Sequence, residues 1–227
     1  MFICDDISFD IDGQKLFSNI NLNIKPQKDL LITGPSGIGK TTLLSILCGI
    51  QKPTTGKITY NSIDLYNLPE NKIDEFRGKN LGVVFQNFNL INTFTVKQNL
   101  EIAVSAIDRK TSIPFFKLLD RVGLANKSHI KVANLSIGEK QRLAVARAFV
   151  GDPKWVFCDE PTSSLDDKNA NIIANLIKEE SMRCKASLVL ITHDSRIQSL
   201  IKLYAKLLLL PTLTRAPVNA PVRLLFT

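Results

Sequence analysis

A glycine-rich stretch of the chain, residues 34–42, has the residue types and spacing of a loop that binds polyphosphate. It contains Gly34, four further residues, and then Gly39, Lys40 and Thr41. The glycines allow backbone N–H groups to approach phosphate oxygens, and the charge of Lys40 suits the β- and γ-phosphates of a nucleotide. The Thr41 hydroxyl suits Mg²⁺. The residues predicted to bind the nucleotide are Gly34, Pro35, Ser36, Gly37, Ile38, Gly39, Lys40, Thr41 and Thr42.

Two carboxylates follow an apolar run later in the chain. Residues 155–158 are Trp, Val, Phe and Cys, and Asp159 and Glu160 come next. A nucleotide hydrolase needs a second group for the metal and a group that orients water, and this pair supplies both. We expect Asp159 to hold hydrated Mg²⁺ and Glu160 to act on the attacking water. An Asp-Glu pair is also common at solvated strand ends, so the prediction depends on the phosphate loop in the same chain.

A strand and a helix are expected on either side of the phosphate loop, where they would position it. Leu30–Thr33 is a short apolar run typical of a buried strand. After the loop, apolar residues recur at helical spacing, and Gly49 is suited to end this helix. The residues of this helix that are predicted to face the core are Leu43, Leu44, Ile46 and Leu47.

Strands that alternate with helices predict a parallel sheet. The apolar run 155–158 and a second run, 187–192, flank a stretch with helical spacing at 172–177. In such a sheet the functional residues gather at the C-terminal ends of the strands. His193 directly follows the second run, so we expect it at the same edge as the two carboxylates.

The rest of the chain divides into an antiparallel part and a helical part. Residues 2–24 alternate apolar and polar residues around an Asp12-Gly13 turn, which predicts antiparallel strands. A further buried strand is expected at 82–85, ending at Gln86. The predicted fold is α/β: a P-loop NTPase core with a parallel sheet, an N-terminal antiparallel β-subdomain and an inserted helical subdomain. Within a single domain, 1–227, we expect a core of residues 1–86 and 152–211, a helical subdomain at 87–151 and an irregular tail at 212–227.

Composition limits the functions that the chain can have. Its 227 residues, 44% of them hydrophobic, can bury the core of one domain. The formal net charge of +8 favours an acidic partner, although the lysines and arginines are scattered. The 4 cysteines show no C-x-x-C spacing, so we expect reduced thiols and no metal cluster of Cys and His. The sequence shows no secretory signal and no apolar run long enough to span a bilayer.

The chain resembles the ATP-binding subunit of ABC transporters from residue 2 to about residue 202. Motifs of that family occur in the family's order. They are the P-loop at 34–42, Gln86 of the Q-loop, Leu135 to Glu139 in place of the signature sequence, Asp159-Glu160, Ser164 to Asp166 of the D-loop, and His193. The resemblance implies that the chain binds ATP with Mg²⁺ and hydrolyses it. It assigns Gln86 to Mg²⁺ and the attacking water, and His193 to the γ-phosphate and, with Glu160, to the orientation of that water.

The resemblance also implies how two copies of the chain would share the nucleotide. In this family two domains form a head-to-tail dimer, and each ATP lies between the P-loop of one copy and the signature helix of the other. Ser136 and the Gly138 N–H would face the γ-phosphate bound by the partner copy. Asp166 would cross the dimer interface.

A more particular resemblance involves residues 85–91, residues 95–100 and Glu139. They are similar to the group of transporters for lipoprotein release, macrolide export and antimicrobial-peptide resistance. Apolar Phe88, Leu90 and Ile91 would form part of a groove that receives an integral membrane permease. The resemblance therefore implies a permease partner, no direct nucleic-acid partner, and a cytoplasmic location at the inner face of the cell membrane, held through the permease.

The sequence also departs from the family. At the position where the family places an aromatic residue that stacks on adenine, this chain has Ile11. Phe9, two residues earlier, is expected to face the same side of the strand as Ile11. We therefore expect ATP binding that is several-fold weaker, because an aromatic pair contributes roughly 0.5 to 1.5 kcal/mol. Ile137 replaces a signature glycine and would be strained if the position required a positive φ. After the histidine, Leu207–Leu210 and a proline-bearing tail replace the family's usual strand and turn.

Two other functions would use the same motifs. The first is an ATP-driven conformational clamp on nucleic acid or a protein assembly. DNA-repair members of that kind carry a long coiled-coil insertion and translation members carry two domains, whereas this sequence has neither. The second is an inactive nucleotide-binding regulator, which Ile11 and Ile137 would permit and which a measurement of ATP turnover would separate. A transport subunit is the leading hypothesis because the Q-loop segment is transport-like.

Overall fold

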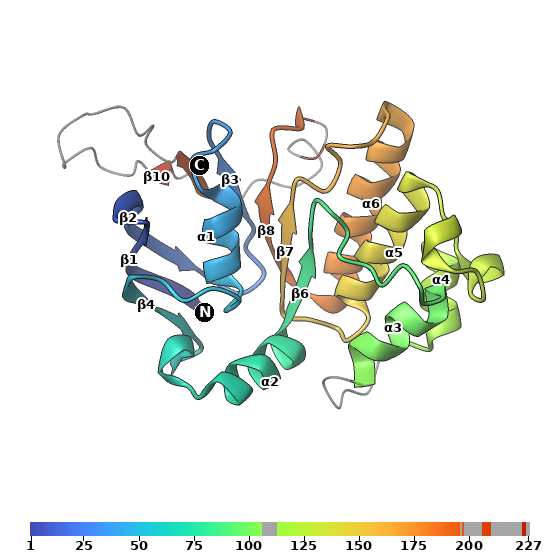
Figure 1. The fold of residues 1–227 in the computed structure, drawn as a ribbon, viewed down its shortest axis with the longest axis horizontal. Coiled ribbons are helices and arrows are strands. Elements are labelled where there is room, and N and C mark those ends of the chain that lie inside the picture. Colours follow the sequence, from blue (N-terminus) through green and yellow to red (C-terminus); the bar gives the residue numbers. More distant parts are fainter. Residues whose placement is uncertain (106–112, 196, 198–205, 210–223, 226–227) are drawn as a thin grey trace.

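Helix α1 lies between two sheets, and helices α3 to α6 form a layer on the other side of the larger sheet (Figure 1). The computed structural model describes residues 1–105, 113–195, 197, 206–209 and 224–225. The α-helices are α1 (Lys40–Leu47), α2 (Glu70–Asn80), α3 (Val96–Ser105), α4 (Phe115–Arg121), α5 (Ile137–Phe149) and α6 (Asp167–Cys184). Short 3-10 turns lie at Leu65–Asn67, Ala125–Lys127 and Val132–Asn134.

The smaller sheet is antiparallel and has the strand order β2-β1-β4-β5. Its strands are β1 (Phe2–Ile11), β2 (Gln14–Ile24), β4 (Thr55–Tyr60) and β5 (Ile63–Asp64). The hairpin between β1 and β2 turns at Asp12 and Gly13, whose φ angles of 50° and 77° suit the right-handed twist of the two strands. The antiparallel strands and the turn predicted from the sequence are confirmed.

The larger sheet has the order β10-β9-β3-β8-β7-β6. Its strands are β3 (Leu30–Thr33), β6 (Leu81–Val84), β7 (Trp155–Asp159), β8 (Ser187–Ile191), β9 (Lys206–Leu209) and β10 (Leu224–Leu225). All pairs are parallel except that of β10 with β9, which confirms the predicted parallel sheet. The prediction of an irregular tail at 212–227 is wrong at β10, which pairs with β9, and otherwise lies outside the described residues.

Strand β7 separates two hydrophobic cores because both of its faces are buried. Trp155 and Phe157 pack in a core with α1 and the antiparallel sheet. Val156 and Cys158, which point the opposite way, pack in a core with helices α3 to α6. Burial on both faces explains why this strand is a continuous apolar run rather than an alternating one.

Helices α3, α4 and α5 bear out the helical character expected for residues 87–151 in the part that the structure describes. Their apolar faces share one core with α6 and the sheet. The division of the chain into a core and a helical subdomain stays a prediction.

Helix α2 was not predicted, because its apolar residues, Ile73 and Phe76, are too few to give a helical pattern; both pack, partly buried, against the core on the α1 side. Exposed ion pairs at helical spacing, such as Lys72–Glu75 at 2.8 Å, add only a little stability to it.

Candidate nucleotide-binding site

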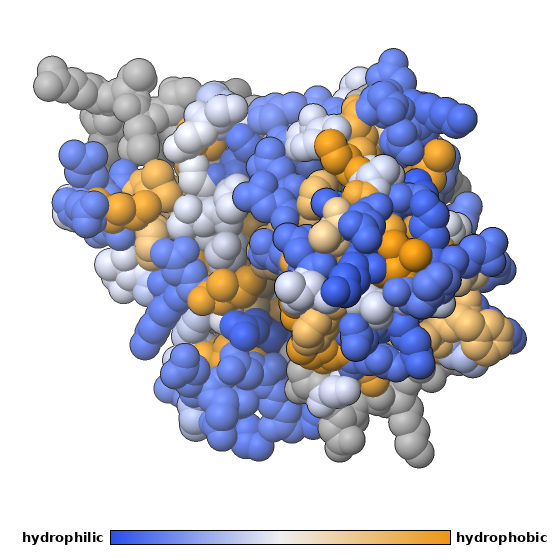
Figure 2. Space-filling model, turned by 45° about the vertical axis from the view of Figure 1, so that its right-hand side comes forward, coloured by the Kyte–Doolittle hydropathy of each residue, from blue (hydrophilic) through white to orange (hydrophobic). Residues whose placement is uncertain are grey.

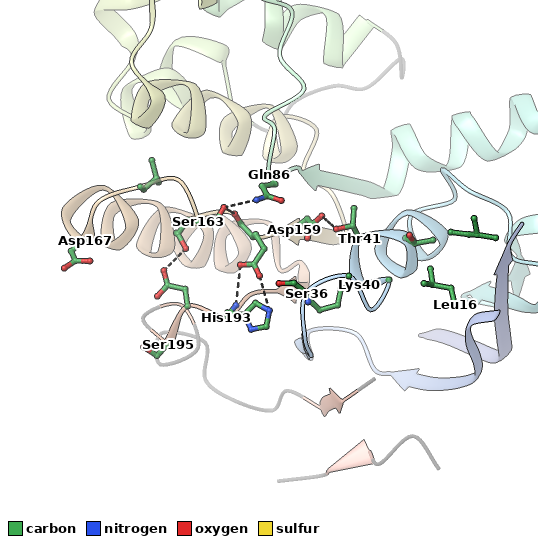
Figure 3. Close-up of a pocket in the computed structure, with 18 residues that line it drawn as sticks. Leu16, Ser36, Lys40, Thr41, Gln86, Asp159, Ser163, Asp167, His193 and Ser195 are labelled. Atoms are coloured by element: carbon green, nitrogen blue, oxygen red, sulfur yellow. Dashed lines mark hydrogen bonds and ion pairs between the residues drawn. The ribbon is translucent and has the colours of Figure 1, made fainter. Parts of the chain in front are cut away.

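A cavity of about 980 Å³ opens where the loop before α1 meets the ends of β6, β7 and β8 (Figure 3). The loop follows β3, so the cavity lies at the C-terminal edge of the parallel strands, where the sequence analysis expected the functional residues. Gln86, Asp159, Glu160 and His193, each just beyond or at the end of a strand, all line it. The residues predicted from separate parts of the sequence are therefore brought together.

The phosphate loop has the backbone that its glycines permit. Gly37 and Gly39 have φ angles of 79° and 93°, in the left-handed region that favours glycine. A Cβ on Gly39 would lie 2.7 Å from the side chain of Leu16, so the loop also packs closely on β2. Of the residues predicted to bind the nucleotide, those that line the cavity are Ser36, Gly37, Gly39, Lys40, Thr41 and Thr42. Ile38 is buried in the core on the α1 side.

Lys40 is held inside the loop that it follows. Its ammonium donates hydrogen bonds to the carbonyl oxygens of Gly34, at 2.7 Å, and Pro35, at 2.8 Å. The side chain is buried, yet it lines the cavity. Gly34 and Pro35, which do not line the cavity, thus contact the site through Lys40. A lysine in this position brings a positive charge to the floor of the loop.

Thr41 and Asp159 form a direct link across the cavity floor. The Thr41 hydroxyl donates a 2.7 Å hydrogen bond to the Asp159 carboxylate. Burial raises the pKa of Asp159 above its usual value, whereas the hydrogen bond from Thr41 and the charge of Lys40 lower it. A hydroxyl and a carboxylate oxygen side by side are ligands that Mg²⁺ prefers. The donor set therefore fits the predicted magnesium site.

Glu160 lies in a constrained position at the end of β7. Its φ angle of 44° is left-handed, and its N–H donates to the Ile191 carbonyl at 2.8 Å. The His193 N–H donates to Oε2 of Glu160 at 3.4 Å, and Nε2 of His193 lies 3.7 Å from Oε1. A non-glycine residue in this conformation is uncommon, and such residues cluster at functional sites. The structure thus pairs the carboxylate and the imidazole that the sequence analysis assigned to catalysis.

Gln86 reaches the same cavity from β6. Its amide lies 3.4 Å from Oγ of Ser163, and that hydroxyl donates to the Glu160 carbonyl at 3.1 Å. A second hydroxyl, that of Thr162, donates to Asp194 at 2.7 Å. Thr162 and Ser163 were not predicted as site residues, although both lie within three residues of Glu160 in the chain.

The wall formed by the antiparallel sheet is apolar. Ile11 and Leu16 line the cavity, and Ile11 is 45% exposed. The expectation that Phe9 faces the same side as Ile11 is wrong. The register of β1 on β2 shifts between Phe9 and Asp10, so Phe9 turns into the core. There the centroid of its ring lies 6.1 Å from that of the Phe17 ring. Leu16, which the sequence analysis missed, takes the place beside Ile11.

Ser136, Gly138 and Asp166 do not line this cavity. Ser136 caps α5: its hydroxyl accepts a 3.3 Å hydrogen bond from the Glu139 N–H, and its own N–H donates to the Glu139 carboxylate. Asp166 caps α6 by accepting hydrogen bonds from the backbone and side chain of Asn169, which lower the pKa of its carboxyl.

Ile137, the residue that replaces a signature glycine, is the first residue of α5. It is 54% exposed, and its φ is not positive. The strain considered from the sequence therefore does not arise.

A loop of this pattern between a parallel strand and a helix, with a magnesium-type donor set beside it, defines a P-loop nucleotide-binding protein. A family profile described as ABC transporter matches residues 17–163. The structure superposes with a TM-score of 0.82 on the ATP-binding cassette MJ0796, in a dimeric post-hydrolysis state bound to ADP and Pi. The two are 28% identical, over 92% of this chain and 94% of that chain.

Similar proteins carry the names of ATP-binding subunits. The lipoprotein-releasing system ATP-binding protein LolD of Buchnera aphidicola is 38% identical over 80% of this chain and 81% of that protein. The bacitracin export ATP-binding protein BceA of Halalkalibacterium halodurans is 34% identical over 81% of this chain and 74% of that protein. The methionine import ATP-binding protein MetN of Sodalis glossinidius is 38% identical over 78% of this chain and 52% of that protein.

The chain belongs to the ABC transporter family, whose ATP-binding cassettes hydrolyse ATP to power transport. The predicted family, fold class and ATPase activity are confirmed. None of the helices in the described part of the chain is long and apolar enough to cross a membrane.

The buried carboxylate of Asp159 predicts that Asp159→Asn stabilises the protein without nucleotide or metal. The folded-state pKa of Asp159 is raised, so ionisation costs folding stability as the pH rises above the usual Asp value of about 3.9. Asparagine removes this cost and still accepts the hydrogen bond from Thr41. The thermal midpoint should rise at pH 7, and the gain should shrink as the pH falls toward 4.

The matched control is Asp166→Asn. Hydrogen bonds lower the pKa of Asp166, so its ionised form stabilises the fold above the usual pKa, and this variant should have a lower midpoint at pH 7. A lower midpoint for Asp159→Asn at pH 7 would contradict the assigned cost of burial.

Proposed function

We propose that the chain is the ATPase subunit of a transporter in the group that contains lipoprotein-release and peptide-antibiotic exporters. In this proposal two copies close on Mg-ATP and act on a separate membrane permease. The observation that carries it is the cavity in which Lys40, Thr41 and Asp159 lie beside Glu160 and His193. Similarity to LolD and BceA supports the choice of exporter group.

The phosphate loop would bind the triphosphate with its N–H groups and Lys40. The Lys40 ammonium, now on the Gly34 and Pro35 carbonyls, would turn to the β- and γ-phosphates, because charged oxygens are stronger acceptors than carbonyls. Thr41, Asp159 and the Gln86 amide oxygen would hold Mg²⁺, which would neutralise phosphate charge. Ile11 and Leu16 would offer the base an apolar wall, with less stacking energy than an aromatic ring.

Glu160 and His193 would act on the attacking water. The Glu160 carboxylate, fixed by its backbone bond to Ile191 and by the His193 N–H, can accept a hydrogen bond from water and hold that water at the γ-phosphate. The exposed imidazole of His193 can donate to a γ-phosphate oxygen. Positioning, rather than covalent chemistry, is what this reaction requires of a protein.

The residues that do not line the cavity support a role for a second copy. Ser136, Gly138 and Asp166 lie at helix starts, where the first N–H groups have no acceptor within the helix. The capping box of Ser136 and Glu139 satisfies two backbone N–H groups and leaves those of Ile137 and Gly138 at the N-terminus of α5. That end attracts an anion, and the γ-phosphate held by a partner copy is suited to it.

The surface after Gln86 would receive the permease. Phe88 and Leu90 are half-buried, and Ile91 is exposed. The helical side of the molecule is mostly hydrophilic with small apolar patches (Figure 2). The exposed apolar residues of α3, of α4 and of the loop before α3 are Ile91, Ile102 and Phe116. Docking through this surface would hold the chain at the cytoplasmic face of the membrane.

Glu160→Gln should retain ATP binding, lose ATP turnover and accumulate as an ATP-bound dimer, because the amide keeps the shape of the side chain but cannot act as a base. Size-exclusion chromatography with saturating Mg-ATP should show twice the monomer mass for this variant. Glu179→Gln, an exposed change on α6, is the control and should behave as the wild type. A Glu160→Gln variant that binds ATP yet stays monomeric would contradict the shared-site dimer. A wild type without turnover would favour the inactive regulator.

Ile91→Asp should reduce recovery of the chain with membranes of its source cells, because a buried charge in the permease groove is costly. Ile63→Asp is the matched control. Ile63 is also an exposed isoleucine, with 43% of its surface exposed against 36% for Ile91, and it lies in the antiparallel sheet, away from the proposed groove. Equal recovery of both variants, or recovery of the wild type with nucleic acid alone, would contradict docking at this surface.

A further inference from the structure

The loop that leaves β6 is held by two side chains from two different helices. Arg147 of α5 donates hydrogen bonds to the carbonyl oxygens of Asn89 and Phe88, the latter at 2.8 Å. Asn99 of α3 is fully buried and accepts a 2.9 Å hydrogen bond from the Ile91 N–H, while its amide donates to the Ile91 carbonyl at 3.1 Å. The loop therefore has few ways to move independently of these helices.

The backbone of the loop is shaped around the Arg147 guanidinium. Phe88 and Asn89 are consecutive non-glycine residues with left-handed φ angles of 59° and 50°. Such a conformation is costly for residues with a Cβ and persists only where surrounding contacts hold it. Here it presents two successive carbonyl oxygens to one planar, rigid set of N–H donors, a geometry that arginine matches and lysine does not.

Arg147 reaches the loop because α5 lies unusually close to β6. A Cβ on Gly82 of β6 would lie 2.2 Å from the carbonyl oxygen of Ala148, the next residue along α5. Burial lowers the pKa of Arg147, although an arginine stays charged in proteins. No salt bridge to Arg147 occurs within the described part of the chain. The charge is therefore directed at the two loop carbonyls.

We propose that Arg147 is a positioning residue that ties the loop of residues 86–91 to α5, and so fixes Gln86 at the nucleotide cavity. The role given to Gln86 at the nucleotide cavity rests on the proposed function.

The test compares hydrogen exchange of the purified full chain in the wild type, Arg147→Gln, Arg147→Lys and Arg77→Gln. Arg77 is the matched control because its guanidinium also donates to a backbone carbonyl, that of Gly49 at 3.0 Å. In Arg147→Gln, amides of residues 88–91 should exchange about tenfold faster or more, because two charged hydrogen bonds are lost. The exchange rates of amides in β6 and α5 should be unchanged, and Arg147→Lys should retain part of the protection of residues 88–91.

Steady-state ATPase kinetics supply the second readout. In Arg147→Gln, kcat should fall several-fold while KM for ATP stays within about twofold, because Gln86 is displaced and the phosphate loop is intact. Unchanged exchange at residues 88–91, equal acceleration across β6 and α5, or an unchanged kcat with a loosened loop would each overturn the proposal. A wild type without turnover would contradict the proposed function, whereas the exchange data would still decide whether Arg147 holds the loop.

Discussion

The hydrogen bond between Thr41 and Asp159 joins the two halves of the nucleotide cavity, and the surrounding fold serves to keep these groups together. Thr41 lies in the first turn of α1, whereas Asp159 ends β7, two strands away from β3 in the sheet. Their separation in the chain is large, so only the parallel alignment of β3, β8 and β7 brings them within 2.7 Å. Burial raises the pKa of the Asp159 carboxyl, and the Thr41 hydrogen bond and the Lys40 charge offset this only in part. The site is thus prepared for positive charge rather than optimised for stability in its absence.

The antiparallel sheet contributes a wall to this site in addition to a second core. Close contact of Gly39 with Leu16 seats the phosphate loop on β2, and Ile11 extends the same wall into the cavity. Helix α1 is held between the sheets by the apolar side chains of its first two turns. The loop is therefore supported from both sides, which allows left-handed glycines without loss of a defined shape.

Local signals explain why much of the fold and site could be predicted. The phosphate loop, the apolar strands and the residues at their ends are short-range patterns, so Lys40, Asp159 and His193 could be located without a structure. Helix α2 could not, since its apolar residues, Ile73 and Phe76, are too few to give a helical pattern and are only partly buried against the core.

Long-range packing explains the rest. The orientation of Phe9 depends on a register shift between β1 and β2, which alternation along one strand cannot reveal. Leu16 enters the site only because the loop packs on β2, and Arg147 meets the loop only because Gly82 lets α5 approach β6. Thr162 and Ser163 lacked a motif of their own, although their place after Glu160 was a usable signal.

The most direct test of the proposed nucleotide site is a crystal structure of the chain with Mg²⁺ and a non-hydrolysable ATP analogue. The triphosphate should lie in the loop of residues 34–42, with the Lys40 ammonium moved from the Gly34 and Pro35 carbonyls to the phosphates. A cation should lie between the Thr41 hydroxyl and the Asp159 carboxylate. A triphosphate bound elsewhere, or bound here while Lys40 stays on the loop carbonyls and the cation avoids Asp159, would contradict the proposed site.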